Sequence, residues 1–262
     1  MSGSQGLQTS KYFKVAAAAI LLQDYCLTLD SEVRWAAEKR WSFTRAAFTI
    51  ARYIPFIGAS LTLAKVFGVM GNQPDCILLW KTEVAFHFLG IVSSECLLTF
   101  RVYVLYDCNR RLICSLAGLG ILMLIAALIA SLAPFASIHG ADQHSPTLCV
   151  FEGSRNNALP FAALLVYELV LALILIARRC TYSGPISRFL AQLYNDGLLY
   201  MFLIISISTA NIIVDLCMPL VYSDLLDAPQ VVVHCILSCR ILFRMQDSGR
   251  DGAFIGYTSS VL

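Results

Sequence analysis

Polar side chains lie inside apolar runs long enough to cross a bilayer, and these side chains carry most of the chemistry that the sequence offers. A charge in hydrocarbon costs about 3 kcal/mol on insertion scales, so such groups are kept mainly where they pair, bind a ligand or line a path for ions. Six of them are predicted to form an outward-facing pocket: Lys65, His87, Glu95, Asn211, Asp215 and His234. The alternative, in which these groups pair inside a helical bundle and bind nothing, stays open.

A second group lies towards the opposite ends of the same runs. Asp24, Arg52 and Arg101 are predicted to form an inner ion network in which Asp24 pairs with Arg52 or with Arg101. Pairing that fixes the register of the helices is the favoured interpretation, because an arginine near a helix end can also extend its head group to the membrane surface.

Carboxylates near the middle of the runs suggest another chemistry. Glu95 and Glu168 fall at mid-depth, and with Asp215 they could line a route for ions or a solute. Motifs of enzymes are missing: the sequence has no phosphate-binding glycine loop, no Gly-x-Ser-x-Gly and no His-Glu-x-x-His. The four histidines, at positions 87, 139, 144 and 234, are too scattered along the chain to predict a metal site. We therefore expect no catalytic residue, no cofactor and no metal.

Two cysteines fall in segments that we place outside the cell, where oxidation is permitted. Cys76 precedes the third apolar run and Cys149 lies in the long segment before the fifth. A disulfide between them would tie that segment over the outer mouth of a bundle, as in heptahelical receptors. Two unpaired thiols are the alternative.

Apolar runs of bilayer length must position these residues. The chain is 58% hydrophobic and 14% charged, whereas about 25% charge is usual in a soluble domain. Helices are expected, because every backbone polar group in lipid must be satisfied within its own segment. The predicted spans are 12–29, 46–69, 82–106, 112–134, 159–177, 197–221 and 228–245. The sequence thus predicts an all-α membrane protein, a bundle of seven transmembrane helices.

The distribution of Lys and Arg predicts the orientation, because cytosolic segments carry the excess. One side holds only Lys11, Lys14, Lys81 and Arg155; the other holds Arg34, Lys39, Arg40, Arg45, Arg110, Arg111, Arg178, Arg179, Arg188, Arg244 and Arg250. We expect the N-terminus outside and the C-terminus in the cytosol. The predicted organisation is an N-terminal tail (1–11), a seven-helix domain (12–245) and a cytosolic tail (246–262).

Several motifs of the chain resemble those of a known family. They are the run from Asp24 to Val33, the tetrapeptide Lys39-Arg40-Trp41-Ser42 and the run Arg52-Tyr53-Ile54-Pro55-Phe56. Together they resemble the signature, about residues 20–60, of basidiomycete fungal membrane proteins with domain of unknown function 6533. The resemblance implies a multi-pass membrane protein and no particular activity.

Function is therefore predicted from architecture. The first hypothesis is a receptor-like protein that senses an external small molecule or lipid. The alternatives are a small transporter or channel that uses Glu95, Glu168 and Asp215, and a structural membrane protein. Expected partners are the lipid bilayer and a cytosolic signalling protein such as a heterotrimeric G protein. The charge balance does not suggest nucleic-acid binding. We expect the plasma membrane or another membrane of the secretory pathway.

Overall fold

The computed structural model of the chain describes residues 2–38, 42–68, 73–138, 158–181, 188–219 and 222–248. Helices account for almost all of these residues. They are α1 (Ser2–Glu38), α2 (Phe43–Val66), α3 (Gln73–Leu105), α4 (Arg110–Ile138), α5 (Ala158–Thr181), α6 (Arg188–Cys217) and α7 (Asp227–Ser248).

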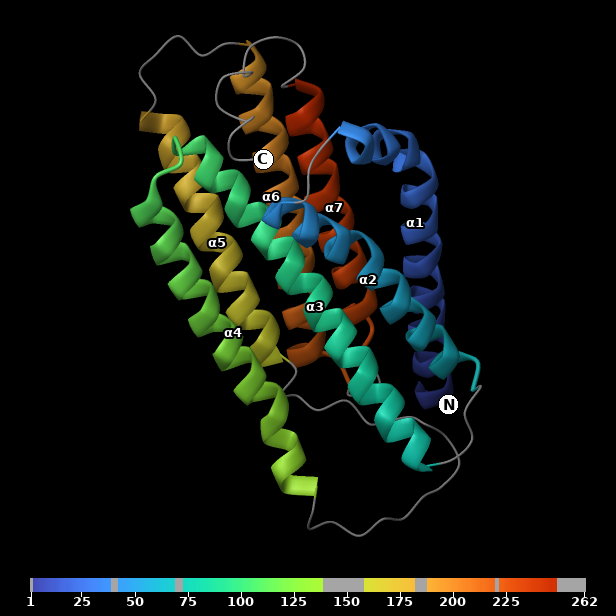
Figure 1. Cartoon of the computed structure of the whole chain (residues 1–262). Coiled ribbons are helices and arrows are strands. Elements are labelled where there is room, and N and C mark those ends of the chain that lie inside the picture. The colour runs from blue at the N-terminus through green and yellow to red at the C-terminus, as the bar shows by residue number, and fades with distance from the viewer. Residues whose placement is uncertain are drawn as a thin grey trace.

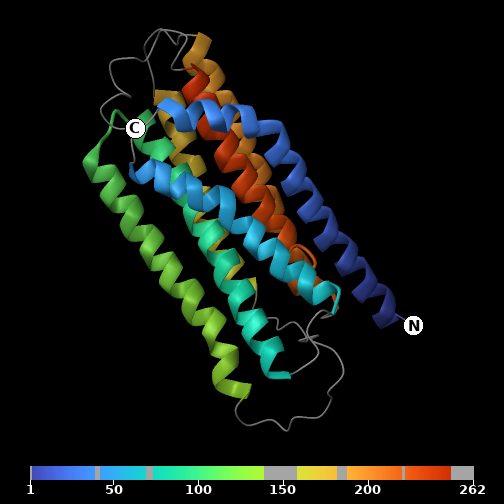
Figure 2. The ribbon, with the colours of Figure 1, turned by 45° about the vertical axis from the view of Figure 1, so that its right-hand side comes forward.

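Seven helices in the described part of the chain are long and apolar enough to cross a membrane. Each contains most of one predicted span, so the prediction of seven apolar helices is confirmed. The helices alternate in direction, which brings the start of α1 and the end of α7 to opposite ends of the bundle (Figures 1 and 2). The chain therefore has the architecture of a multi-pass membrane protein.

The first helix is longer than the apolar run that predicts it. The sequence places a charged connection after position 29, but α1 continues to Glu38 and the next described helix begins at Phe43. The continuation brings Glu32 to a buried position, 8% exposed. Charge in this stretch therefore marks more than a solvated connection, because one of its carboxylates faces the bundle.

Burial separates the central helices from the peripheral ones. In the most apolar 18-residue stretch of each helix, the buried share is 72% in α7 and 56% in α3 but only 11% in α4. The two figures agree with this difference: α4 lies at the edge of the bundle in both views (Figures 1 and 2). Functional side chains that need several neighbours are therefore expected on α3 and α7.

Local interactions fix the connection between α3 and α4. Asp107 and Cys108 adopt left-handed backbone conformations, with φ of 52° and 58°. Asn109 accepts a hydrogen bond from the backbone N–H of Arg111 through its side chain (3.0 Å), which caps the start of α4. Arg178 of α5 donates to the carbonyl oxygen of Leu105 (3.2 Å) at the end of α3. The turn thus also joins α5 to α3.

An apolar core fills the space between α3, α4, α5, α6 and α7. Its fully buried members include Leu98, Leu171, Leu175, Tyr194 and Ile204. Many buried residues elsewhere in the bundle are polar or charged. Since buried polar groups are costly unless they find partners, their contacts indicate where function is to be sought.

Candidate functional site

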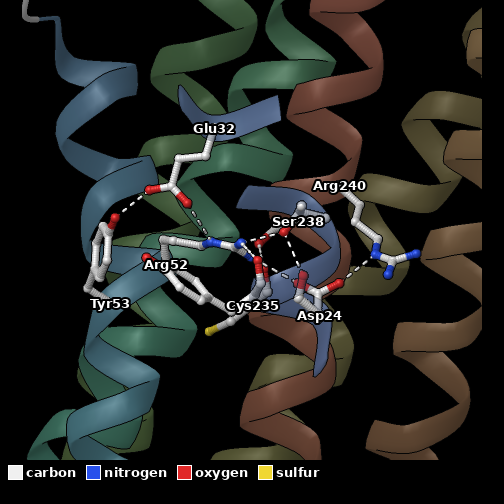
Figure 3. Close-up of polar contacts among 9 residues, drawn as sticks. Asp24, Glu32, Arg52, Tyr53, Cys235, Ser238 and Arg240 are labelled. Carbon is white, nitrogen blue, oxygen red and sulfur yellow. Dashed lines mark hydrogen bonds and ion pairs between the residues drawn. The ribbon is translucent and has the colours of Figure 1, made fainter. Parts of the chain in front are cut away.

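Arg52 of α2 lies at the centre of a buried ion cluster. Its Nη1 is 2.9 Å from Asp24 Oδ2, and its Nε is 3.2 Å from Glu32 Oε2. Arg240 of α7 binds the other oxygen of Asp24, with 2.6 Å between Nε and Oδ1 (Figure 3). We call Asp24, Glu32, Arg52 and Arg240 the arginine cluster. It joins α1, α2 and α7.

Neutral groups complete the arginine cluster. Arg52 donates to the hydroxyl of Thr28 and to the carbonyl oxygen of Tyr25 (3.4 Å). Tyr53 donates its hydroxyl to Glu32 (Figure 3). Two carboxylates and two guanidinium groups balance in charge, and all three guanidinium nitrogens of Arg52 donate hydrogen bonds. Such saturation is what a buried ion cluster needs in order to be tolerated.

A second buried cluster, which we call the core centre, contains Glu95 of α3, Glu168 of α5 and His234 of α7. The Nε2 atom of His234 is 3.0 Å from Glu168 Oε1, and its Nδ1 is 3.4 Å from Glu95 Oε1. Glu168 and His234 are fully buried, and Glu95 is 9% exposed. One imidazole therefore lies between two carboxylates on three different helices.

The core centre is not saturated. Within the described part of the chain, neither oxygen of Glu95 accepts a hydrogen bond, nor does Oε2 of Glu168. The ring nitrogens of His234 lie at ion-pair distance without hydrogen-bond geometry. Buried acceptors of this kind are rare in folded proteins and call for an explanation.

A chain of hydrogen bonds leads away from the core centre towards the start of α7. Ser208 donates to Glu168 Oε1 (2.8 Å), and Gln230 donates to Ser208 Oγ (3.0 Å). Asn211 then donates to Gln230 Oε1 (2.6 Å) and to Asp227 Oδ1 (3.3 Å). We call Ser208, Gln230, Asn211 and Asp227 the polar chain. It connects Glu168, a carboxylate in the middle of α5, with the end of the bundle that is predicted to lie outside.

Asp215 is a further buried carboxylate near that end. It is 1% exposed, and neither of its oxygens accepts a hydrogen bond from the described residues. The charge that acts on it most is another carboxylate, Asp224. Asp227 experiences both of these acids and, more weakly, the ammonium group of Lys14. The start of α7 is therefore an acidic region.

The remaining pocket residues lie between α2 and α3. Lys65 pairs with Glu83 (2.5 Å), which also accepts a hydrogen bond from Thr62 (2.6 Å). His87 packs against Gly58 so closely that an added Cβ at position 58 would lie 2.8 Å from its ring. His87, Thr62 and Lys14 help to line a small cavity.

The structure thus places the six predicted pocket residues in three groups. Glu95 and His234 meet in the core centre, Asn211 belongs to the polar chain with Asp215 nearby, and Lys65 and His87 lie between α2 and α3. The alternative interpretation, pairing inside the bundle, describes Lys65 well. It describes Glu95 only in part, because His234 lies at ion-pair distance without hydrogen-bond geometry, and it does not describe Asp215, whose oxygens lack donors among the described residues.

Arg101 occupies a site apart from the arginine cluster. It is 3% exposed and lies against Gly197 of α6, where an added Cβ would be 2.0 Å from its Nη2. Asp196 is the acidic group that acts on it most. Of the two predicted partners of Asp24, Arg52 is the one in contact, and Arg240 joins it.

The predicted disulfide lies outside the described residues. Cys149 is not described, and the side chain of Cys76 is not described either. The pairing of these two cysteines stays a prediction.

Several members of these clusters were not predicted as site residues. Glu32 follows Asp24 and Thr28 at intervals of four, which places all three on one face of a helix, so this spacing was a usable signal. Ser208 precedes Asn211 by three residues and shares its face in the same way. The partnership of His234 with Glu168 has no such signal, because it joins distant helices. The scattered histidines predict no metal site, yet the fold brings one of them to two glutamates.

Comparison with known proteins finds a family similarity in the first two helices. No curated protein and no solved structure matches the chain. Residues 12–57, which run from α1 into α2 and include three members of the arginine cluster, match DUF6533, a family of unknown function.

Proposed function

We propose that this protein is a receptor-like heptahelical membrane protein in which an external ligand acts on the core centre and α7 passes the change to the arginine cluster. One observation carries the proposal. α7 contributes His234 to the core centre and Arg240 to the arginine cluster. Arg240 follows His234 by six positions, about 9 Å along the helix axis.

The two clusters suit different parts of such a mechanism. The arginine cluster ties α7 to α1 and α2, so a displacement of α7 must strain or rearrange its ion pairs. The core centre ties α7 to α3 and α5 with unsatisfied groups, so its geometry depends strongly on any bound charge. A ligand shifts an equilibrium only through different affinities for two states, and unpaired buried carboxylates provide such a difference for a cation.

The polar chain indicates how the ligand is sensed. It leads from Asp227, near the end predicted to be outside, to Glu168 in the core centre. Asp215 and Asp224 add negative charge at the same end. A small cationic or polar molecule is therefore favoured over an anion.

A distance measurement tests the coupling. Spin labels carried by noncanonical amino acids at Val33 of α1 and Leu199 of α6, both exposed, report how these helices lie at the arginine-cluster end. We expect His234→Gln to change the distance distribution and His87→Gln, a control at another histidine, to leave it unchanged. A folded His234→Gln protein with the parental distribution would exclude coupling through α7.

The cytosolic partner is tested separately. Under the receptor proposal, crosslinking in native membranes recovers a heterotrimeric G protein, and replacement of Arg101 reduces the recovery. If crosslinking recovers no such protein, this choice of partner is wrong, while the distance measurement still reports on the coupling.

A transporter or channel is the second candidate, and the polar chain favours it. A path for protons or cations needs consecutive groups within hydrogen-bonding distance, which the polar chain and Glu168 provide over part of the bundle. In this case purified protein in liposomes carries an ion flux that Glu95→Gln abolishes. Such a flux would reject the receptor proposal. A purely structural protein would show neither the flux nor the ligand response.

Orientation and origin belong to the same proposal. The excess of Lys and Arg supports an external N-terminus and a cytosolic C-terminus, in the plasma membrane or another secretory-pathway membrane. The signature motifs support a basidiomycete origin. Thiol labelling of intact cells after reduction should reach Cys76 and Cys149 but not Cys108 or Cys180. The opposite labelling pattern would reverse the orientation.

A further inference from the structure

We propose that the core centre is a binding site for one divalent transition-metal cation of the Zn²⁺ class, with Glu95, Glu168 and His234 as its protein ligands. A carboxylate oxygen from each glutamate and one imidazole nitrogen lie within 4.8 Å of one another. Tetrahedral ligand atoms about 2.0–2.2 Å from a zinc ion are about 3.4 Å apart. Binding therefore requires the most widely spaced of these atoms to approach one another by about 1 Å.

Charge balance supports a divalent occupant. Two ionised carboxylates and a neutral imidazole carry two negative charges, and a divalent cation brings the buried total to zero. An isolated net charge is strongly disfavoured in a low-dielectric interior. The charges that act on His234 are those of Glu168 and Glu95. No Lys or Arg side chain of the described residues forms an ion pair with either glutamate.

The unsatisfied oxygens are the second line of support. Both oxygens of Glu95 and Oε2 of Glu168 are buried without hydrogen-bond donors in the described structure. A metal ion would directly satisfy one oxygen of Glu95 and Oε2 of Glu168. Protonation of the centre also balances the charge, but a proton supplies one donor at most to each carboxyl group and leaves acceptors unused.

The surroundings of Glu168 resemble the support that ligands of metal sites receive. Its Oε1 accepts a hydrogen bond from Ser208, which in turn accepts one from Gln230. Partners of this kind fix the orientation of a ligand, and their loss typically lowers metal affinity about 10–100-fold. Oε2 remains available to a cation.

The donor set decides the class of metal. Imidazole nitrogen suits Zn²⁺ and its neighbours in the first transition row, whereas Mg²⁺ and Ca²⁺ prefer sites made of oxygen alone. Three protein ligands leave the fourth tetrahedral position to water or another small molecule. The ligands come from α3, α5 and α7, so a bound ion would draw three helices together.

This inference concerns the same centre as the proposed function, but it does not depend on signalling. A protein that binds the cation and fails to couple α7 to the arginine cluster would satisfy the metal proposal and refute the receptor proposal. Binding and distance measurements can therefore fail separately.

Metal content of the purified full-length protein tests the proposal. Tag-free protein in nanodiscs is stripped with a chelator, equilibrated with Zn²⁺ and freed of excess ion, and its zinc is then counted by elemental mass spectrometry. We expect one Zn²⁺ per chain. Glu168→Gln and His234→Asn should weaken binding at least tenfold. Glu83→Gln and His87→Asn, which replace a buried glutamate and a half-buried histidine of α3 outside the core centre, should retain it.

Spectroscopy on the unmodified protein keeps the test valid if a variant fails to fold. X-ray absorption of the Zn²⁺ form should show one imidazole and oxygen ligands. Sulfur ligands would place the ion on the cysteines and overturn the proposal, as would several imidazoles. Absence of stoichiometric Zn²⁺, or equal binding by His234→Asn, would also overturn it and leave the core centre as a site for protons.

Discussion

The arginine cluster and the core centre each bury two carboxylates, yet they differ in what surrounds them. In the arginine cluster, Arg52 and Arg240 supply two fixed positive charges and several oriented donors. In the core centre a single imidazole lies between Glu95 and Glu168, and three carboxylate oxygens lack donors in the described structure. One cluster is complete and the other has coordination capacity left over.

The difference separates a structural role from a binding role. The arginine cluster resists change, because removal of either arginine leaves an uncompensated buried carboxylate. An incomplete cluster is costly to the fold and is better explained by an occupant that binds there. α7 belongs to both clusters, so the fold joins a rigid contact to a responsive one. Substitutions in the arginine cluster should therefore mainly lower stability, and substitutions in the core centre should mainly lower ligand affinity.

The largest loss of stability is expected for Arg52→Leu. Among the described residues it would leave Glu32 without an ion-pair partner and Asp24 paired with Arg240 alone. Breaking a buried pair in this way costs about 3–5 kcal/mol. Unfolding of the purified protein in detergent, followed by circular dichroism, measures the loss. A change below about 1 kcal/mol, as found for exposed pairs, would show that the arginine cluster is not structural.

A smaller loss is expected for Gly197→Ala, which tests a third buried arginine. The new Cβ would lie 2.0 Å from the Arg101 guanidinium and displace it from α6, and such overpacking costs about 1–3 kcal/mol. Gly118→Ala is the matched control, because a Cβ there meets nothing within 4 Å. The control should be neutral or slightly stabilising. Equal stability of both variants would mean that the site of Arg101 does not require a glycine.

The fold was largely predictable from the sequence, because each apolar run is long enough to predict a helix without reference to the others. The end of α1 was not predictable in this way. Charges between Asp30 and Glu38 look like a solvated connection, but the helix continues and Glu32 reaches Arg52. Helix periodicity would have indicated this face, whereas hydropathy alone could not.

The candidate site was predictable only as a set of residue types. Position along the apolar runs brought Asp24 and Arg52 to one level, and the two side chains form an ion pair in the fold. It could not show that His234 faces Glu168, or that Arg101 lies against Gly197, because these contacts depend on helix rotation and on which helices are neighbours. Such pairings need the three-dimensional arrangement.

Glu95→Gln is expected to change stability by less than about 1 kcal/mol, because it removes a buried charge that lacks hydrogen-bond donors in the described structure. The same substitution should lower the affinity for Zn²⁺ at least tenfold. Calorimetry with the same protein in nanodiscs gives the affinity, and detergent unfolding gives the stability. If Glu95→Gln destabilised the fold as strongly as Arg52→Leu, the distinction between a structural and a binding cluster would be lost.

The smallest effect is expected for an exposed ion pair beside the arginine cluster on the same helix. Arg34 pairs with Asp30, but their side chains are 50% and 79% exposed, and pairs of this kind contribute about 0.2–1 kcal/mol. Glu32, two residues earlier, is buried against Arg52. Arg34→Gln should therefore leave the free energy of unfolding almost unchanged, while Glu32→Gln should lower it clearly. A similar response to both would show that charge in this segment of α1 matters through its total rather than through burial, and the arginine cluster would lose its special position.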